Sequence, residues 1–303
     1  AAWFPPLRVN DQVVILHGNT ARLPAAARRT MVEAGMMRVL QATSGKTLFD
    51  VPLAGVYAAH RFPPLAVLHG QKVILPSPGG EILAFSLADL LKRKNRILWQ
   101  MRPSGSGSVL SATGDPAAPR VYVARTGVRG EKNISAISTE NGATLWSVSN
   151  DAISTPLALY GKLVVFGTQF GRITALDTST GKTVMNTAPE LDLAPDNENR
   201  VMAISEPVVD SLGRVYVAFA LVPLELAAKL ASNRSVEGEK LEDVVEAEVV
   251  GVQLPGGKRI YQSALFELHT LQWGKLLLGM ETVGLFSQPD KMAYCIPEKD
   301  AEP

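Results

Sequence analysis

The residue types that most often carry chemistry are few in this chain, and their spacing matches no reactive motif. The four histidines, His17, His60, His69 and His269, stand at no spacing typical of metal ligands. Cys295 is the only cysteine, so neither an intrachain disulfide nor a cysteine-based zinc site can form. No G-x-S-x-G nucleophile motif occurs. The sequence therefore predicts no catalytic residue, no metal site and no bound cofactor.

Two segments could bind phosphate or another anion locally. Residues 104–108 alternate serine and glycine but lack the lysine and helix that follow in a phosphate-binding loop, so we interpret them as a flexible linker. Residues 92–96 read Lys-Arg-Lys-Asn-Arg and follow a short helical pattern at 86–91. We interpret this basic run as a solvated loop between strands, with contact to an acidic partner as the alternative.

Composition narrows the class of protein. Of 303 residues, 46% are hydrophobic and 19% are charged, which is enough apolar surface for a core and excludes disorder over most of the chain. The net charge of +1 provides no global attraction to nucleic acid or to an anionic membrane. The longest apolar run, at 215–224, is interrupted by Pro223 and is far shorter than the roughly twenty residues of a transmembrane helix.

Internal repeats decide the fold. Phe-Pro-Pro-Leu at residues 4–7 returns at 62–65, each followed by β-rich sequence. Turn-plus-strand units recur along the chain, and each ends on one large apolar residue: Phe49, Trp99, Trp146, Met185, Tyr261 and Tyr294. Residues 156–187 show the complete unit, four short runs rich in β-branched and aromatic residues and separated by turns.

A single four-stranded unit cannot bury both of its faces, whereas sheets stacked around an axis can. The sequence therefore predicts an all-β protein, a β-propeller of four-stranded antiparallel blades. Six repeats are visible, and seven or eight blades are possible if the ring is completed elsewhere. We expect residues 1–303 to form one propeller domain.

The repeat motif resembles a known family. Residues 173–184 read Ile-Thr-Ala-Leu-Asp-Thr-Ser-Thr-Gly-Lys-Thr-Val, and 134–146 form a weaker copy that ends on Trp146. Both are similar to the A-L-D-x-x-T-G-x-x-x-W repeat of the pyrroloquinoline-quinone-like propellers. The resemblance implies that Asp177 and Gly181 close the turn between the outer strands and that the terminal aromatic packs between blades. Because Met185 replaces the tryptophan and Ser138 the aspartate, we expect irregular tryptophan docking.

The resemblance is in the repeat and does not extend to the catalytic features of the quinone-dependent dehydrogenases. One cysteine cannot form the adjacent-cysteine disulfide of the alcohol dehydrogenases, and no counterpart of the calcium cluster is recognisable. The non-catalytic members are closer in size: a periplasmic lipoprotein that assists outer-membrane β-barrel assembly, and sensor halves of kinases. The resemblance thus implies a non-enzymatic binding or scaffold module with protein partners in a periplasmic or other extracytoplasmic complex. A degenerate enzyme or small-ligand sensor that uses the axial funnel is the alternative.

Two insertions interrupt the repeats, at about 17–37 and 223–248. We expect the first to be a loop. The second combines a short amphipathic helix, from Leu226 and Leu230 at i and i+4, with a solvated acidic stretch that runs to Glu246 and Glu248. It is either a decorative loop or a partner-docking element, and the candidate interaction residues are Leu224, Leu226, Leu230, Glu239, Glu242 and Asp243.

Three experimental outcomes follow from this interpretation. The protein should not bind pyrroloquinoline quinone with calcium. Trp146→Ala should lower the free energy of unfolding by roughly 3–5 kcal/mol, as for a large aromatic residue lost from a core. Replacement of residues 221–249 by a short Gly-Ser turn should leave the melting temperature nearly unchanged and abolish partner binding.

Overall fold

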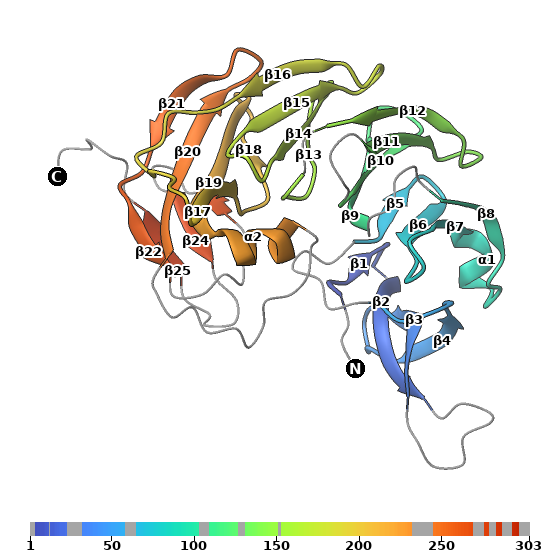
Figure 1. Ribbon diagram of the computed structural model, residues 1–303. Coiled ribbons are helices and arrows are strands. Elements are labelled where there is room, and N and C mark those ends of the chain that lie inside the picture. The colour runs from blue at the N-terminus through green and yellow to red at the C-terminus, as the bar shows by residue number, and fades with distance from the viewer. Residues whose placement is uncertain are drawn as a thin grey trace.

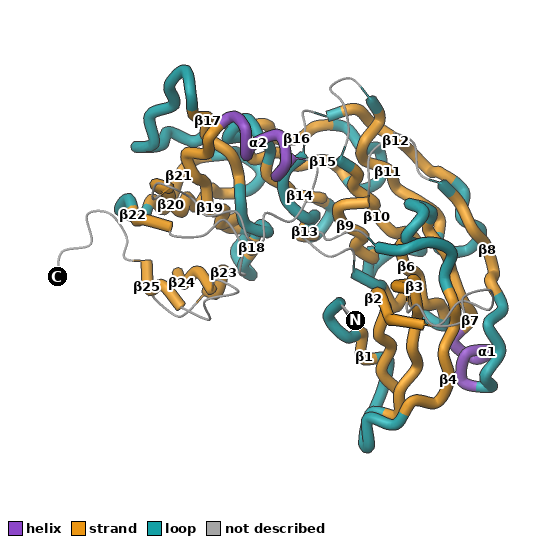
Figure 2. The backbone as a smooth tube through the Cα atoms, turned by 60° about the horizontal axis from the view of Figure 1, so that its bottom comes forward, coloured by secondary structure: helices purple, strands orange, loops and turns teal. Residues whose placement is uncertain are grey.

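The computed structural model describes residues 4–11, 13–22, 32–57, 65–102, 109–126, 131–150, 153–231, 245–268, 276–278, 283–286 and 293–296. Within these ranges the strands form six antiparallel sheets, which follow one another in chain order along an arc (Figures 1 and 2). The predicted all-β propeller of stacked four-stranded units is therefore confirmed.

The first four sheets each have four strands in sequential order, and each strand pairs with the next along the chain. Their strands are β1 (Leu7–Arg8), β2 (Val13–Arg22), β3 (Val32–Gln41), β4 (Thr47–Pro52); β5 (Val67–His69), β6 (Lys72–Pro76), β7 (Ile82–Ser86), β8 (Ile97–Met101); β9 (Val109–Gly114), β10 (Arg120–Arg125), β11 (Lys132–Ser138), β12 (Thr144–Ser149); β13 (Ala158–Tyr160), β14 (Leu163–Gly167), β15 (Ile173–Asp177), β16 (Thr183–Thr187). A short helix, α1 (Leu87–Leu91), lies between β7 and β8.

The fifth sheet is larger, because its two middle strands are long enough to pair with two strands on each side. It contains β17 (Asn199–Ala203), β18 (Val208–Val209), β19 (Arg214–Pro223), β20 (Val245–Gln253), β21 (Lys258–Gln262) and β22 (Phe266–Leu268), with α2 (Leu224–Ala231) after β19. The sixth sheet contains β23 (Leu276–Leu278), β24 (Val283–Phe286) and β25 (Ala293–Ile296).

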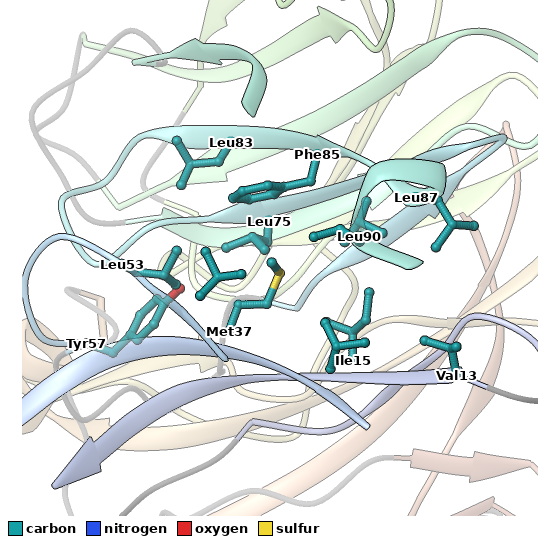
Figure 3. Packing of buried hydrophobic residues seen from close by; sticks show 13 residues of the cluster. Val13, Ile15, Met37, Leu53, Tyr57, Leu75, Leu83, Phe85, Leu87 and Leu90 are labelled. Carbon is teal, nitrogen blue, oxygen red and sulfur yellow. The ribbon is translucent and has the colours of Figure 1, made fainter. Parts of the chain in front are cut away.

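Apolar layers between successive sheets hold the arc together. In β10, Val121 and Val123 pack toward the second sheet while Tyr122 and Ala124 pack toward the fourth. Because both faces of the sheet are covered, the strand is an almost continuous apolar run instead of an alternating one. Figure 3 shows the layer between the first two sheets, where Ile15 and Met37 meet Phe85 and the α1 residues Leu87 and Leu90.

The N-terminal residues that the structure describes belong to the first sheet. The Phe4 N–H donates to the His17 carbonyl (2.9 Å), and Leu7 pairs with Ile15. The sequence left open whether the N-terminus adds a strand to the last blade. Residues 1–3, on which that question depends, lie outside the described residues. Residues 4–8 run beside β2 in the first sheet.

The first expected insertion is not mainly a loop, and that interpretation was wrong. Strands β2 and β3 pair continuously from Val13–Gln41 to Arg22–Val32, so most of the segment 17–37 is a long β-hairpin. The buried Asn19 side chain accepts a hydrogen bond from the Tyr57 N–H and donates one to the Tyr57 carbonyl. Because these bonds satisfy the amide in the interior, a polar residue can occupy a buried strand position here.

A β-bulge recurs in the fourth strand of the first five sheets, one residue before the predicted anchor. In β12, Trp146 pairs with Ala136 and Thr144 with Ile137, so that Leu145 is left out of the ladder. The residues left out in the other sheets are Leu48, Leu98, Val184 and Ile260. A bulge turns its extra residue out of the regular pairing. Accordingly, Leu145 and Val184 are about half exposed although they are apolar (50% and 46%).

Candidate functional site

Two of the predicted anchor residues, Trp99 and Trp146, dock their sheets onto the next sheet along the chain. The Trp99 Nε1–H donates to the Thr139 carbonyl (3.0 Å) and the Trp146 Nε1–H to the Thr178 carbonyl (2.9 Å), in each case from one sheet to its neighbour. Each ring also lies against a glycine of the neighbouring turn. A Cβ added at Gly181 would lie 2.7 Å from Trp146 Cε3, so only glycine permits this approach.

The turn that receives Trp99 and the turn that receives Trp146 form equivalent hydrogen bonds, although only the second contains an aspartate. The Asp177 carboxylate accepts hydrogen bonds from the Ser179 and Thr180 hydroxyls and from their N–H groups, and the hydroxyl bonds contribute most to lowering the pKa of Asp177. In the preceding sheet Ser138 Oγ accepts from the Glu140 N–H, and the Gly142 N–H donates to the Ser138 carbonyl, as the Gly181 N–H does to Asp177. The irregular docking expected from Ser138 is therefore absent between the described sheets that carry Trp99 and Trp146.

The other predicted anchors differ in what they contact. Met185 is buried and its sulfur would lie 3.3 Å from a Cβ at Gly257 of the next sheet. Phe49 packs against the apolar layer that contains Leu87 and Leu90. In the second sheet, helix α1 therefore takes the place of the glycine turn that receives the anchor residue in the third and fourth sheets. Tyr261 packs against Tyr216 within the fifth sheet, at a ring-centroid distance of 5.7 Å. The backbone of Tyr294 lies in β25, and its side chain is outside the described part of the structure.

The best candidate for a binding surface lies where second strands turn into third strands. The turn between β14 and β15 brings Phe170 to the surface, 47% exposed, and the Arg200 guanidinium carbon lies 5.8 Å from the centroid of its ring. Arg200 comes from β17 of the next sheet, where it pairs with Val222 just before α2. An exposed aromatic ring under a guanidinium combines the two residue types that are most enriched at protein interfaces.

Helix α2 begins beside β17, the strand that carries Arg200, and confirms the helical part of the second insertion. It lies below β17 in Figure 1, and the Leu224 N–H donates to the Glu198 carbonyl (2.9 Å), which ties its first residue to the loop before β17. Leu224 is 39% exposed, whereas Leu226 packs against the core of the fifth sheet and Ala227 is buried. We call Phe170, Arg200 and Leu224 the Phe170 patch.

The predicted interaction residues are therefore only partly brought together. Leu224 is available at the surface, but Leu226 faces the core and does not extend a common apolar strip with it. The backbone of Leu230 lies in α2, and its side chain is not among those described. Glu239, Glu242 and Asp243 lie outside the described residues.

Glu248 was predicted in a solvated acidic stretch, and that prediction was wrong. It is fully buried on β20, where one carboxylate oxygen accepts from the Asp192 N–H (2.9 Å) and the other from Gln262 Nε2 (2.6 Å). Burial raises the pKa of Glu248 above its usual range, although these hydrogen bonds oppose the shift. Through Asp192, Glu248 therefore hydrogen-bonds the segment that connects the fourth and fifth sheets to β20. Its neighbours Ala247 and Val249 are buried apolar residues, and that pattern was the available sequence signal for a strand.

The histidines that the structure describes lie apart from the Phe170 patch. His17 is buried on β2 and packs edge-on against Phe4 and Tyr57, with ring centroids 5.0 and 5.7 Å away. His69 ends β5, and His60 and His269 fall outside the described residues. Among the described side chains, no three histidine, cysteine, aspartate or glutamate groups gather as metal ligands do. Neither α1 nor α2 has the length and apolar character of a membrane-spanning helix.

Comparison with known proteins places the repeat in a family. A family model described as outer membrane protein assembly factor BamB matches residues 87–264, more than half of the chain. The crystal structure of BamB from Moraxella catarrhalis matches with 15% identity and a TM-score of 0.46, over 98% of this chain and 91% of that chain. The crystal structure of the computationally designed Ika8 protein matches with 13% identity and a TM-score of 0.44, over 97% and 95%. No curated protein matches the sequence.

Proposed function

This chain belongs to the family of the outer membrane protein assembly factor BamB, and from that premise we propose that it is a non-enzymatic scaffold. It binds a protein partner in an extracytoplasmic complex. Membership in this family supports the scaffold role, and the site residues themselves suggest how the partner is bound.

The observation that carries the proposal is the Phe170 patch. Phe170 keeps about half of its surface exposed, whereas Phe166 of the same sheet and Phe219 of the next sheet are fully buried between sheets. Because exposing a phenylalanine costs hydrophobic free energy, an exposed ring in a rigid turn is typical of a contact surface. Its turn is rigid here, since the Phe170 and Arg172 N–H groups both donate to Thr168 Oγ1.

The patch joins two sheets and a helix, which suits it to hold a partner in one orientation. The Ala203 N–H donates to the Thr168 carbonyl (3.0 Å), so the turn that carries Phe170 is bonded directly to the end of β17, the strand that carries Arg200. An aromatic residue and an arginine that are already positioned lose little conformational freedom on binding. We expect these two side chains to contribute most of the binding free energy.

Affinity capture from the native source, followed by mass spectrometry, identifies the partner, and its dissociation constant is then measured with purified proteins. Phe170→Ala and Arg200→Ala should each weaken binding by tenfold or more, the effect expected for a residue at the centre of an interface. Leu212→Ala is the matched control, because Leu212 is 66% exposed in the turn between β18 and β19, at the opposite end of β19 from α2. Unchanged affinity in both patch variants would contradict the proposal.

A further inference from the structure

The second sheet differs from its neighbours in the turn before its fourth strand. Where the structure describes the corresponding turn of another sheet, that turn is short and contains a glycine with positive φ, such as Gly142 or Gly181, whereas here the chain forms α1 and then the basic run. Ser86 Oγ accepts from the Asp89 N–H at the start of α1 (3.2 Å). At its end the Lys92 and Lys94 N–H groups both donate to the Asp89 carbonyl, so the backbone of the run is held in place.

The side chains of this segment divide into a buried and an exposed set. Leu87 and Leu90 pack into the layer between the first and second sheets (Figure 3), while every residue from 91 to 98 is exposed. The exposed set contains three large apolar side chains, Leu91 (47%) before the cations and Ile97 (45%) and Leu98 (38%) after them. We call residues 91–97 the basic turn; its cations are Lys92, Arg93, Lys94 and Arg96.

None of these four cations forms an ion pair with another residue that the structure describes. A protein with a net charge of +1 therefore carries a local excess of four positive charges within five residues. Figures 1 and 2 both show α1 at the outer edge of the molecule, so the turn that follows it projects from the rim.

We propose that the basic turn binds the surface of an anionic phospholipid membrane. Lysine and arginine next to such a surface are attracted by its negative potential, and exposed leucine and isoleucine beside them enter the boundary between headgroups and acyl chains. This proposal does not depend on the scaffold function, because the basic turn and the Phe170 patch lie on different sheets and in different connections.

An acidic protein partner fits the same charge but not the shape of the turn. A stable protein interface buries about 800 Å² on each partner, with complementary packing at its centre. One projecting turn of seven residues offers little of that area, and its apolar side chains flank the charges instead of forming a central contact. A lipid surface requires no such complementarity, since charge and apolar insertion act residue by residue.

Vesicle flotation with the full chain tests the proposal. Vesicles of equal parts phosphatidylglycerol and phosphatidylcholine should carry the protein, whereas vesicles of phosphatidylcholine alone should not, and added salt should weaken the binding. The double variant Lys92→Gln and Lys94→Gln should bind the anionic vesicles roughly 10- to 30-fold more weakly, about fivefold for each charge removed. Leu91→Ser should weaken binding without changing its salt dependence.

The matched control is Lys162→Gln with Lys182→Gln, two exposed lysines of the fourth sheet. It changes the net charge equally and should retain binding. Equal loss in both double variants, or no binding of the unaltered protein to anionic vesicles, would overturn the proposal. Binding to polyglutamate through the basic turn, without binding to vesicles, would also overturn it and assign the turn to an acidic protein. Melting temperatures of all variants show that the fold is kept.

Discussion

A buried carboxylate at a sheet-to-sheet connection makes stability depend on pH. Glu248 is fully buried between the Asp192 N–H and Gln262, and burial raises its pKa. A raised pKa means that the folded chain binds the proton more tightly than the unfolded chain. Its contribution to stability is therefore fully present below the ordinary glutamate pKa of about 4.3 and is lost as the pH rises through the raised value.

Glu248→Gln removes the titrating carboxyl group. The glutamine still has an amide oxygen that can accept the hydrogen bond from the Asp192 N–H. We expect the free energy of unfolding of the unaltered protein, relative to that of the variant, to fall as the pH rises above about 4 and through the raised pKa of Glu248. Urea unfolding at a series of pH values measures the difference. Glu246→Gln, the same change at an exposed position of β20, separates the effect of burial from that of the side-chain change. A pH-independent difference for Glu248→Gln would show that the carboxylate ionises freely.

The residues that dock the sheets could be predicted from the sequence, but their partners could not. Trp99 and Trp146 stand out because the repeat places one large apolar residue at the end of each unit. The groups that receive them are the backbone carbonyls of Thr139 and Thr178, and a backbone acceptor has no side-chain signature. The same holds for Phe170, a single residue in a turn, whose arginine partner is thirty positions away in the chain.

At the scale of elements, a helix could be predicted at the second insertion, but the extent of its neighbouring strands could not. Leu226 and Leu230 indicated the helix, and α2 spans Leu224–Ala231. The acidic residues before and within β20 concealed the strand, because Glu246 is exposed and Glu248 is buried with hydrogen-bond partners. Polar residues at buried strand positions, as at Asn19 in β2, remove the alternation from which strands are recognised.

The second insertion is therefore shorter than expected, and the replacement that tests it must be narrower. Replacement of residues 232–244 by a short Gly-Ser linker keeps both α2 and β20, and the melting temperature should change by no more than a few degrees, since loop closure depends weakly on length. Replacement of 221–249 removes Val222, Ala227 and Val245, which are buried in the fifth sheet, and should abolish cooperative unfolding. Thermal melts followed by circular dichroism compare the two. Loss of folding in the narrow variant would assign residues 232–244 to the core.

At the scale of the molecule, the sheets are stabilised mainly by the layers between them. Each of four apolar clusters contains residues from two successive sheets, and the fifth covers the fifth sheet and α2. Strand β23 of the sixth sheet contacts β18 and β19. A sheet separated from its neighbours would expose both apolar faces, so one sheet cannot remain folded when an adjacent layer is lost. Stacked units whose interfaces dominate their intrinsic stability unfold together.

Trp99→Ala tests this cooperativity. It is a better choice than Trp146→Ala because the Trp99 side chain is buried (8% exposed), whereas Trp146 is only partly buried and its loss removes less from the core. The substitution removes a ring from the layer between the second and third sheets together with its hydrogen bond to Thr139. We expect the free energy of unfolding to fall by about 3–5 kcal/mol. Because the layers couple the sheets, circular dichroism and intrinsic tryptophan fluorescence should still report one coincident transition at the lower midpoint. Two separate transitions would mean that the first two sheets unfold independently of the rest, and the chain would then be two cooperative units and not one domain.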